Sequence, residues 1–530
     1  MPDSVDFIVV GGGSSGCALA ARLSEDAGNT VALLEAGGNG DSWMIKAPAA
    51  VVLMVPKKIN NWAFDTVPQA GLNGRIGYQP RGKVLGGSSA INAMVYIRGQ
   101  RADYDHWAEL GNPGWSFQDV LPYFIKSERN HEIHNELHGN DGPLSVSRLQ
   151  TDNPFQRYYL EAARQAGYPL NEDFNGPTQE GLGIYQVTQE NGERWSAFRG
   201  YLQPHLGRTN LRVETGALTQ RILFEGRRAV GVEYRQNGQL RTLLARREVL
   251  LCAGALQSPQ LLQLSGVGNG ADLQKLGIEV VHNLPGVGKN LHDHPDFIFG
   301  YKSDDINLLG LSLKGGLHLL RQIQRYRRES RGLITSNFAE GGGFLKTRPE
   351  LADPNIQLHF VIALVDDHAR TLHLGHGLSC HVCLLHPKSR GTVKLKDNKA
   401  ETAPLIDPAF LSHPDDIEEL VAGYKMTDRL MKTPALSHFI TSDPFTANVK
   451  TDDDIRAVLR QRVDTVYHPV GSCKMGSDPL AVVDASLKVH GLAGLRVVDA
   501  SIMPRIVGGN TNAPAIMIAE KAADLIKAGR

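Results

Sequence analysis

A run of small residues near the N-terminus has the spacing of a nucleotide-binding turn. Gly11-Gly12-Gly13-Ser14-Ser15-Gly16 matches the pattern G-x-G-x-x-G, and Glu35 follows 24 residues after Gly11. Such glycines permit a tight bend, close approach of backbone to a pyrophosphate, and packing of helix on strand, while the acidic residue accepts hydrogen bonds from ribose. The run predicts dinucleotide binding. A plain structural turn has the same composition, and the pattern does not distinguish FAD from NAD.

The elements around this turn are those that the motif requires. An apolar strand over residues 7–10 precedes it, a helix over 14–24 follows, and a second strand covers 31–34. This is a β-α-β unit, which predicts a parallel sheet. Further strands are expected at 211–214, 229–234, 248–252 and 495–498, with a helix at 258–264. We therefore expect one α/β domain assembled from the start, middle and end of the chain.

The pattern of expected secondary structure changes between about residues 300 and 460. There we predict longer alternating strands at 355–364, 378–385 and 391–395, and a polar helix at 415–430. Alternating apolar and polar residues are typical of an antiparallel sheet with one buried face. We expect this second, α+β domain to be inserted into the first.

Composition excludes several classes of protein. The chain has 530 residues and equal numbers of basic and acidic residues, 56 of each, so it lacks the basic excess of a nucleic-acid-binding protein. With 42% hydrophobic and 21% charged residues it is an ordinary globular sequence, although 56 glycines are an excess. Five cysteines make a disulfide framework improbable and favour a reducing compartment. No signal peptide and no run of eighteen apolar residues is found.

Two further glycine-containing segments could contact a ligand. Residues 82–92 (GKVLGGSSAIN) combine glycines, hydroxyls and an amide in an irregular segment able to wrap a flat polar molecule, although an ordinary surface loop is an equal alternative. Residues 254–268 (GALQSPQLLQLSGVG) are typical of the end of a strand, a helix and a glycine stop.

Together these three segments resemble the glucose–methanol–choline (GMC) family of flavoprotein oxidoreductases. The likeness continues through residues 287–294, 387–391, 467–471 and 496–504, and so covers nearly the whole chain. Within the family the sequence is most similar to bacterial FAD-dependent primary alcohol dehydrogenases, with choline dehydrogenases as further relatives. The resemblance implies a discontinuous Rossmann-like FAD-binding domain formed by residues 1–155, 206–298 and 463–530. It implies a substrate domain formed by residues 156–205 and 299–462.

The resemblance also implies how FAD is held. Some relatives tether the flavin through a histidine at the position of Ile91, and an isoleucine cannot make that bond, so noncovalent FAD is expected. The residues implied to contact it are Gly11, Gly13, Ser14, Ser15, Gly16, Glu35, Ala36, Val84, Gly87, Ser88, Asn92, Ala93, Met94, Val95, Leu218, Ala253, Gly254, Asp499, Ala500, Asn510, Thr511, Asn512 and Pro514.

His468 matches the catalytic histidine of the family. Alone, a histidine in a Tyr-His-Pro turn is more often structural, but imidazole titrates near neutrality and suits removal of a hydroxyl proton. The implied reaction is proton transfer from an alcohol to His468 with hydride transfer from its α-carbon to flavin N5. Asn512 falls where relatives carry a histidine or an asparagine; its amide can orient the alkoxide oxygen but cannot act as a base.

The same segment is expected to begin the last helix. A polar cap at residues 510–512, Pro514 in the first turn and an Ala-rich stretch to about residue 528 predict it. Its positive end, directed at the flavin, would stabilise the anion that reduction creates.

Two histidine- and cysteine-containing patterns are given a structural interpretation. Cys380 and Cys383 form a C-x-x-C near several histidines, but no second pair accompanies them and in a strand they would point to opposite faces. The His292-Asp293-His294 run is explained by the family likeness as a motif near the domain junction. No metal is expected.

Residues 313–331 form a basic amphipathic helix. Leu319, Ile323 and Tyr326 share one face, and Arg321, Arg325 and Arg328 share another, with further charge from residues 327 and 331. Such a helix can lie peripherally on an anionic membrane surface, and more often it covers a core with a solvated outer face. Both readings stay open, so the expected location is the cytoplasm or the inner face of the cell membrane.

The expected function is oxidation of a primary alcohol to an aldehyde, with electrons passed to a quinone, the respiratory chain or another non-oxygen acceptor. The alternatives are an oxidase that makes peroxide from O2 and, from another class, an FAD-containing hydroxynitrile lyase. The non-catalytic alternative is a membrane-associated flavin-binding protein. Aliphatic, aromatic and polyether alcohols all stay open as substrates. The expected pocket residues are Gln357, His359, Val361, Val466 and Tyr467.

Overall fold

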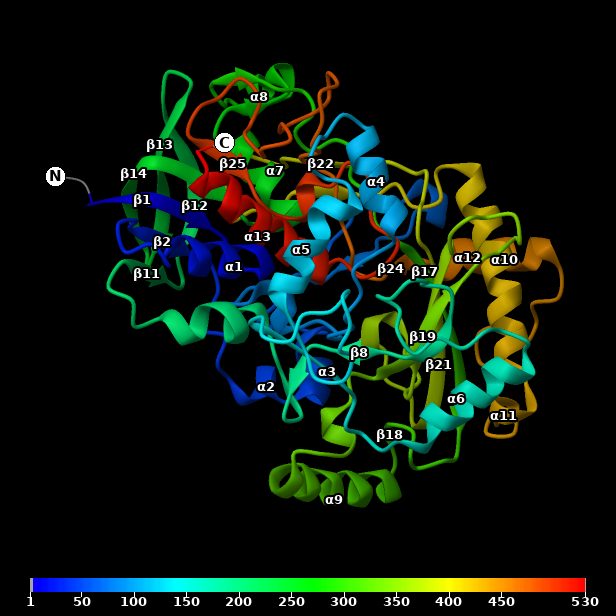
Figure 1. Cartoon of the computed structure of the whole chain (residues 1–530). Helices are drawn as coiled ribbons and strands as arrows, with labels where there is room; N and C mark the ends of the chain where they lie inside the picture. Colours follow the sequence, from blue (N-terminus) through cyan, green and yellow to red (C-terminus); the bar gives the residue numbers. More distant parts are fainter. Residues whose placement is uncertain (1–2, 530) are drawn as a thin grey trace.

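The computed structural model describes residues 3–529 and contains two seven-stranded sheets, which lie in separate halves of the view in Figure 1. The first sheet has the order β11-β2-β1-β14-β13-β12, with β25 beside β14. The second has the order β24-β17-β21-β20-β19-β7, with β18 beside β21. The predicted fold class, an α/β domain combined with a domain built on an antiparallel sheet, is confirmed.

Distant segments of the chain meet in the parallel part of the first sheet. β1 (Asp3–Val10) lies between β2 (Val31–Leu34) and β14 (Gln239–Leu251), and β11 (Leu211–Glu214) and β25 (Leu495–Val497) are added in parallel. Every residue from 7 to 10 and from 31 to 34 is buried, as in a sheet covered on both faces. The order brings the carboxyl ends of β1, β2, β14 and β25 to one edge.

The first sheet is mixed rather than wholly parallel. β12 (Leu218–Glu225), β13 (Arg228–Gln236) and the first half of β14 form an antiparallel meander. The turn between β13 and β14 is Asn237-Gly238, and both residues have positive φ, 51° and 78°. Because such a turn matches the twist of paired strands, these neighbours form a hairpin with no crossover helix between them. The strand predicted at 229–234 lies in this meander, and the strand predicted at 248–252 agrees with the second half of β14, which pairs in parallel with β1 and β25.

Two long helices pack together beside the parallel strands. α1 (Ser14–Leu23) begins directly after the glycine turn, and α13 (Asn512–Lys527) ends the described chain. The Ser15 hydroxyl donates to the Ala515 carbonyl at 2.8 Å. The N-terminal ends of both helices therefore face the same edge of the sheet.

Successive residues in the strands of the second sheet point alternately to an apolar face and to a polar face. β17 (Pro295–Ser303), β21 (Gly375–Leu384), β20 (Ile356–Val361) and β19 (Ala339–Leu345) pair antiparallel. Leu358 and Phe360 belong to a core that also contains side chains of α10 (Pro414–Met431), while Gln357, His359 and Val361 alternate with them on the other face. α6 (Pro154–Gln165) and α12 (Asp452–Arg462) add to the same core. The helical layer leaves the polar face of β20 free to line a site.

The edge strands of this sheet come from outside the main inserted segment. β7 (Gly181–Ile184) pairs with β19, and β24 (Asp464–Thr465) pairs with β17. β24 begins one residue after the start of residues 463–530, the segment predicted to belong to the FAD-binding domain. Val466, Tyr467 and His468 follow it directly. The domain boundaries themselves stay predictions.

α9 (Leu313–Glu329) lies at the lower edge of the molecule, next to the short strand β18 (Gly310–Leu311) and away from the other strands of both sheets (Figure 1). Gly315 is its only buried residue, and Ile323 and Tyr326 are half-buried. Leu313, Leu317 and Leu320 point away from the protein with exposed fractions of 93, 63 and 59%. The sequence predicted one apolar face turned to the core; the helix in fact carries a second, outward one. Within residues 3–529 no helix is both long and apolar enough to cross a membrane.

Candidate active site

A large cavity runs between the two sheets and receives the N-terminal ends of α1 and α13. Gly13 precedes α1 as its N-cap, and no side chain caps the free N–H groups there. Backbone N–H groups at the start of a ten-residue helix, with the helix dipole behind them, form a ready site for phosphate. Ser14 and Ser15 line the cavity at this point.

Two glycine segments approach too closely for side chains. A Cβ on Gly87 would lie 2.6 Å from the Cα of Gly13, and Gly87 has φ +52°. Gly82 would place a Cβ 2.1 Å from the Gly87 carbonyl carbon. The glycine turn and the loop over residues 82–92 therefore form one continuous backbone cradle, and the alternative of an ordinary surface loop is wrong.

Glu35 is held at the end of β2 with its carboxylate in the cavity wall. Its Oε2 accepts from the Gly12 N–H at 2.9 Å and its Oε1 from the Gly37 N–H at 2.7 Å. Burial raises the pKa of this carboxyl to about 7. Each oxygen keeps a second lone pair, so the group can still accept a hydrogen bond from a ribose hydroxyl. These features fit an adenine dinucleotide.

Asn512 joins the two helix ends. Its Oδ1 accepts from the Ser14 hydroxyl at 2.7 Å, so its amide lies at the phosphate end of the cavity. Thr511, the N-cap of α13, has no side-chain cap. The predicted side-chain cap is thus absent from this helix, and its first N–H groups stay free to face a ligand. The predicted role of Asn512, orienting the alkoxide oxygen, stays a prediction.

His468 lies in a strained turn that directly follows β24. Tyr467 adopts φ +77°, which is uncommon for a non-glycine residue. The buried Asp293 accepts from the His468 N–H at 2.9 Å, and the half-buried Arg81 donates to the Tyr467 carbonyl at 2.7 Å. These two bonds hold a backbone conformation that would otherwise relax, and they aim the imidazole into the cavity.

The imidazole of His468 has a partner on each nitrogen. Its Nδ1 is 3.0 Å from Nδ1 of His294, and its Nε2 is 3.2 Å from Nδ2 of Asn510. Burial, with the nearby His294, His359 and Arg81, holds the pKa of His468 well below its usual range. The ring is therefore neutral at neutral pH, and the amide that contacts it belongs to Asn510, which lines the cavity two residues before Asn512.

The wall opposite the nucleotide end combines apolar side chains with histidines and other polar groups. Phe338, Val361 and Val466 line it, and His359 projects from the free face of β20. Burial lowers the pKa of His359 to about 3, and its Nδ1 is buried with no partner in the described chain. A neutral imidazole nitrogen without a partner is available to a polar group of a ligand.

Most residues predicted from the sequence line this cavity. The predicted pocket residues His359, Val361, Val466 and Tyr467 do so, as does His468. The predicted cofactor contacts that line it are Gly11, Gly13, Ser14, Ser15, Glu35, Ala36, Gly87, Ser88, Asn92, Ala93, Met94, Val95, Leu218, Ala253, Gly254, Asp499, Ala500, Asn510, Thr511 and Asn512.

Four predicted residues lie behind the lining. A Cβ on Gly16 would meet the Gly11 carbonyl at 1.9 Å, so this glycine serves helix packing. Val84 and Pro514 are buried, Val84 in a small apolar cluster and Pro514 within α13. Gln357 donates to Oδ1 of Asn510 at 3.0 Å from outside the cavity wall.

Sequence reasoning missed several lining or supporting residues. Trp62, Arg81, Asn337 and Phe338 line the cavity, and His294 supports His468 from behind. Only His294 carried a sequence signal, as part of the His292-Asp293-His294 run. The other four stand in segments without a motif.

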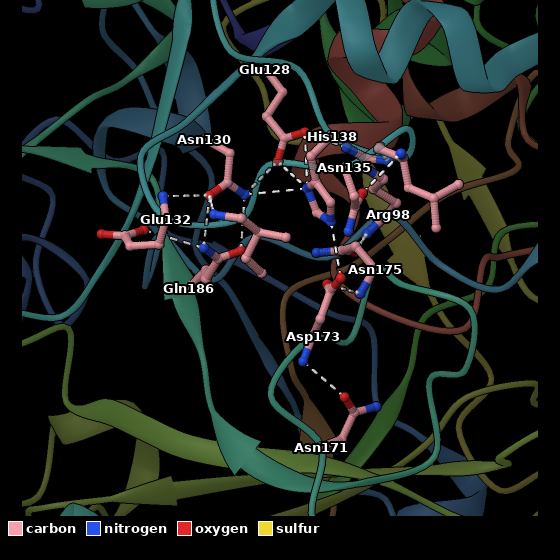
Figure 2. A network of polar contacts seen from close by, with 12 residues as sticks. Arg98, Glu128, Asn130, Glu132, Asn135, His138, Asn171, Asp173, Asn175 and Gln186 are labelled. Carbon is pink, nitrogen blue, oxygen red and sulfur yellow. Dashed lines mark hydrogen bonds and ion pairs between the residues drawn. The ribbon is translucent and has the colours of Figure 1, made fainter.

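A buried polar network supports the segment that follows the 82–92 loop. Arg98, six residues after the end of the 82–92 loop, pairs with Glu128 and donates to the Leu137 carbonyl at 2.6 Å. His138 contacts Glu128 at 2.9 Å and Asp173 at 3.1 Å, as Figure 2 shows. Burial by itself lowers the pKa of His138, but its bonds to Asp173 and Glu128 outweigh that effect and raise it to about 9.

The cysteine pattern on β21 has no chemistry of its own. Cys380 faces the α10 core, Cys383 bonds the Gln357 carbonyl, and burial raises the pKa of both thiols. All five cysteines are buried free thiols. No group of three or more metal-binding side chains is found among residues 3–529.

Comparison with known proteins gives a consistent result. The family model for GMC oxidoreductase matches residues 5–296 and 387–519. The Pseudomonas putida protein named alcohol dehydrogenase (acceptor) is 46% identical over 98% of this chain and 95% of its own. Human mitochondrial choline dehydrogenase is 44% identical over 99% and 90%. The crystal structure of pyridoxine 4-oxidase from Mesorbium loti superposes with a TM-score of 0.88 and 30% identity, covering 98% of both chains.

Proposed function

The chain belongs to the GMC family of flavoprotein oxidoreductases, and from this premise we propose that it oxidises an uncharged primary alcohol to an aldehyde. The observation that carries the proposal is the position of His468. Its neutral imidazole faces a cavity whose other end is a dinucleotide cradle. A base at that point can take the hydroxyl proton of an alcohol bound between the two.

We propose that FAD is held noncovalently along the cradle. The uncapped start of α1 would bind the pyrophosphate and Glu35 the ribose, and the start of α13, which Asn512 joins to α1, would face the flavin. Ile91 lines the cavity and offers no atom for a covalent bond to the cofactor. When bound, FAD would supply the acceptor for the hydride that leaves the α-carbon of the alcohol.

Side chains of the protein would accept the hydroxyl proton and stabilise the charge that its loss creates. Burial keeps His468 neutral, so that it can accept a proton without first losing one. Asn510 would donate its amide N–H to the alcohol oxygen as negative charge develops there. Arg81 and Asp293 would fix the turn and hold the imidazole at the required position.

The lining favours an uncharged substrate over choline. Glu35 and Asp499 are the only acidic side chains that line the cavity in the described chain. Glu35 belongs to the nucleotide end, and the Asp499 carboxylate is occupied by the Gly254 N–H and the Ser258 hydroxyl. A quaternary ammonium ion would therefore lose its hydration without gaining a carboxylate partner. The valines and Phe338 instead favour an apolar chain or ring.

Anaerobic stopped-flow mixing with a panel of alcohols tests this proposal. Aliphatic and aromatic primary alcohols should bleach the flavin faster than choline, and faster reduction by choline would contradict an uncharged substrate. His468→Gln should retain FAD and slow reduction by about 10²-fold or more. An unchanged rate would remove His468 from its role, and no bleaching with any alcohol would favour the lyase alternative.

We propose that a quinone or another non-oxygen acceptor reoxidises the enzyme. The name of the Pseudomonas putida relative supports this choice. Mixing the reduced protein with O2 or with a soluble quinone separates the two cases. Faster reoxidation by O2, with peroxide released, would identify an oxidase.

We also propose peripheral contact of α9 with an anionic membrane, at the inner face of the cell membrane. The outward face carries Leu313, Leu317 and Leu320, and Arg321 and Arg328 flank it with positive charge. Exposed leucines next to cations fit the boundary between acyl chains and anionic headgroups. Leu374 adds to the apolar surface beside β18 with an exposed fraction of 82%.

Cosedimentation with vesicles of phosphatidylcholine, with and without phosphatidylglycerol, tests this contact. Replacing Leu313, Leu317 and Leu320 together by Ser should abolish binding to the anionic vesicles. Leu240→Ser removes an exposed leucine from β14 and should leave binding unchanged. Equal binding by both variants would refute the contact, and self-association without lipid would assign the leucines to a second copy of the chain.

A further inference from the structure

His468, which lines the cavity, and His294, which lies behind it, face one another through their Nδ1 atoms. Nδ1 of His294 and Nδ1 of His468 are 3.0 Å apart, and the rings are nearly perpendicular at 87°. A hydrogen bond at this distance requires one nitrogen to carry a hydrogen and the other a lone pair. The distance alone does not show which of the two Nδ1 atoms carries the hydrogen. The other hydrogen bonds of the two rings show it.

The far nitrogen of His294 fixes its own state. His294 Nε2 is 3.1 Å from the carbonyl oxygen of Val507, and a carbonyl can only accept. Nε2 must therefore carry a hydrogen. Burial lowers the pKa of His294 to about 3, so the ring is neutral and its Nδ1 is a bare lone pair. His468 must then donate from Nδ1.

The opposite side of His468 is reached by an independent chain of hydrogen bonds. Tyr185 donates its single hydroxyl hydrogen to the Leu358 carbonyl at 2.6 Å, so its oxygen accepts from Nε2 of Gln357 at 3.2 Å. The same Gln357 amide nitrogen donates to Oδ1 of Asn510 at 3.0 Å. This orients the Asn510 side chain, which then turns its N–H toward Nε2 of His468.

Both series of hydrogen bonds require the same neutral tautomer of His468. The bond from His294 to the Val507 carbonyl requires His468 to carry hydrogen on Nδ1. The bond from Gln357 to Asn510 requires His468 to accept a hydrogen bond on Nε2. The other neutral tautomer would set two lone pairs against each other at His294 and two N–H groups against each other at Asn510. Asn510 lines the cavity and His294 does not, so the bare nitrogen is the one on the substrate side.

We infer that His294 is a positioning residue that fixes the tautomer of His468, so that Nε2 is the nitrogen that takes the proton of the alcohol. The inference rests on the proposed role of His468 as base. His294 itself exchanges no proton with substrate; it supplies a fixed acceptor. When Nε2 is protonated, the resulting imidazolium keeps its Nδ1–H bond to His294, so that side of the ring does not rearrange, while the Asn510 N–H, which can no longer donate to Nε2, turns to the alkoxide oxygen.

Two nearly isosteric variants isolate this hydrogen bond. In His294→Asn the amide oxygen lies near the former Nδ1 position and can accept from His468. In His294→Leu the volume is similar and the acceptor is gone. Both variants lose the bond to Val507, so the difference between them reports the acceptor alone. FAD content and the apparent Kd for alcohol should be the same in both.

The rate constant of flavin reduction at saturating alcohol is the main readout. His294→Leu should lower it by at least about tenfold, toward the roughly 10⁴-fold that a wrong tautomer costs in a Ser-His-Asp triad. His294→Asn should stay within about tenfold of the wild-type protein. Equal rates in the two variants would overturn the inference.

A spectroscopic measurement covers the case in which a variant loses stability. The ¹⁵N shifts of histidine-labelled holoenzyme, with His468→Gln for assignment, report which ring nitrogen carries hydrogen. The wild-type protein should show His468 protonated on Nδ1, and hydrogen on Nε2 would refute the inference directly. A wild-type rate in His468→Gln would instead refute the proposed function, so the two failures are distinguishable.

Discussion

Replacing Asn510 by Ala removes the only amide N–H that contacts the base nitrogen of His468 in the described chain. Asn510 Nδ2 is 3.2 Å from that nitrogen, and its Oδ1 is held by Gln357 at 3.0 Å. The N–H is thus aimed at the place where an alcohol oxygen must sit to lose its proton. We expect Asn510→Ala to slow flavin reduction while FAD content stays unchanged.

The size of the effect follows from the kind of bond that is lost. A preorganised donor to developing negative charge is worth about 2.7–4 kcal/mol, or roughly 10²–10³ in rate. The contact to His468 is at the long end of the usual range. The amide is, however, oriented by Gln357 before substrate arrives, so no cost of ordering is added. We therefore expect a loss of about 10²-fold in the rate constant of reduction.

Asn512→Ala is the matched control. This asparagine contacts the Ser14 hydroxyl at 2.7 Å and lies at the phosphate end of the cavity. Its loss should weaken FAD retention by about 2- to 10-fold, the worth of one ordinary hydrogen bond, and leave the reduction rate within about threefold. Anaerobic stopped-flow absorbance and the ratio of flavin to protein measure the two effects. A slow Asn512→Ala beside a normal Asn510→Ala would refute the assignment and return the role to Asn512.

The remaining predictions concern the cradle and the buried network. Glu35→Gln should lower FAD retention by about tenfold, because an amide NH2 must face the N–H of Gly12 or Gly37; unchanged flavin content would contradict the ribose assignment. Gly87→Ala should lose FAD, because its Cβ would meet Gly13, whereas Gly226→Ala, also at positive φ but in open space, should keep it; equal losses would refute the cradle. For His138, whose folded pKa of about 9 exceeds the unfolded value near 6.5, about 3 kcal/mol of stability should be present below pH 6.5 and be lost as the pH rises through 9, which urea unfolding at several pH values measures.

The family, the fold class and most of the cofactor cradle could be predicted from the sequence. The glycine turn, its following helix and Glu35 are local in the chain, so their spacing alone determines that they meet. The strands at residues 31–34 and 211–214 agree with β2 and β11, and the helix predicted at 415–430 agrees with α10. The family assignment is confirmed by both halves of the GMC model.

The outward face of α9 could not be predicted. Its periodicity defines faces but not which of them turns to the core, and apolar residues stand on more than one face. Ile323 and Tyr326 are half-buried against the protein while Leu313 is 93% exposed. Only the position of the helix relative to β18 and the following segment decides this.

The choice between two nearby amides shows the same limit at the active site. The motifs in the sequence were sufficient to recognise the family, and that resemblance implied that His468 and Asn512 belong to one site. Which amide faces His468 depends on the path of the backbone through Gly508 and Gly509 into α13, and the structure selects Asn510. His294 lies 174 residues from His468, and the direction of the bond between them is set by Val507, on a third segment. Spacing along a chain does not encode such contacts; only tertiary packing brings the three segments within hydrogen-bonding distance and so fixes which nitrogen is the base.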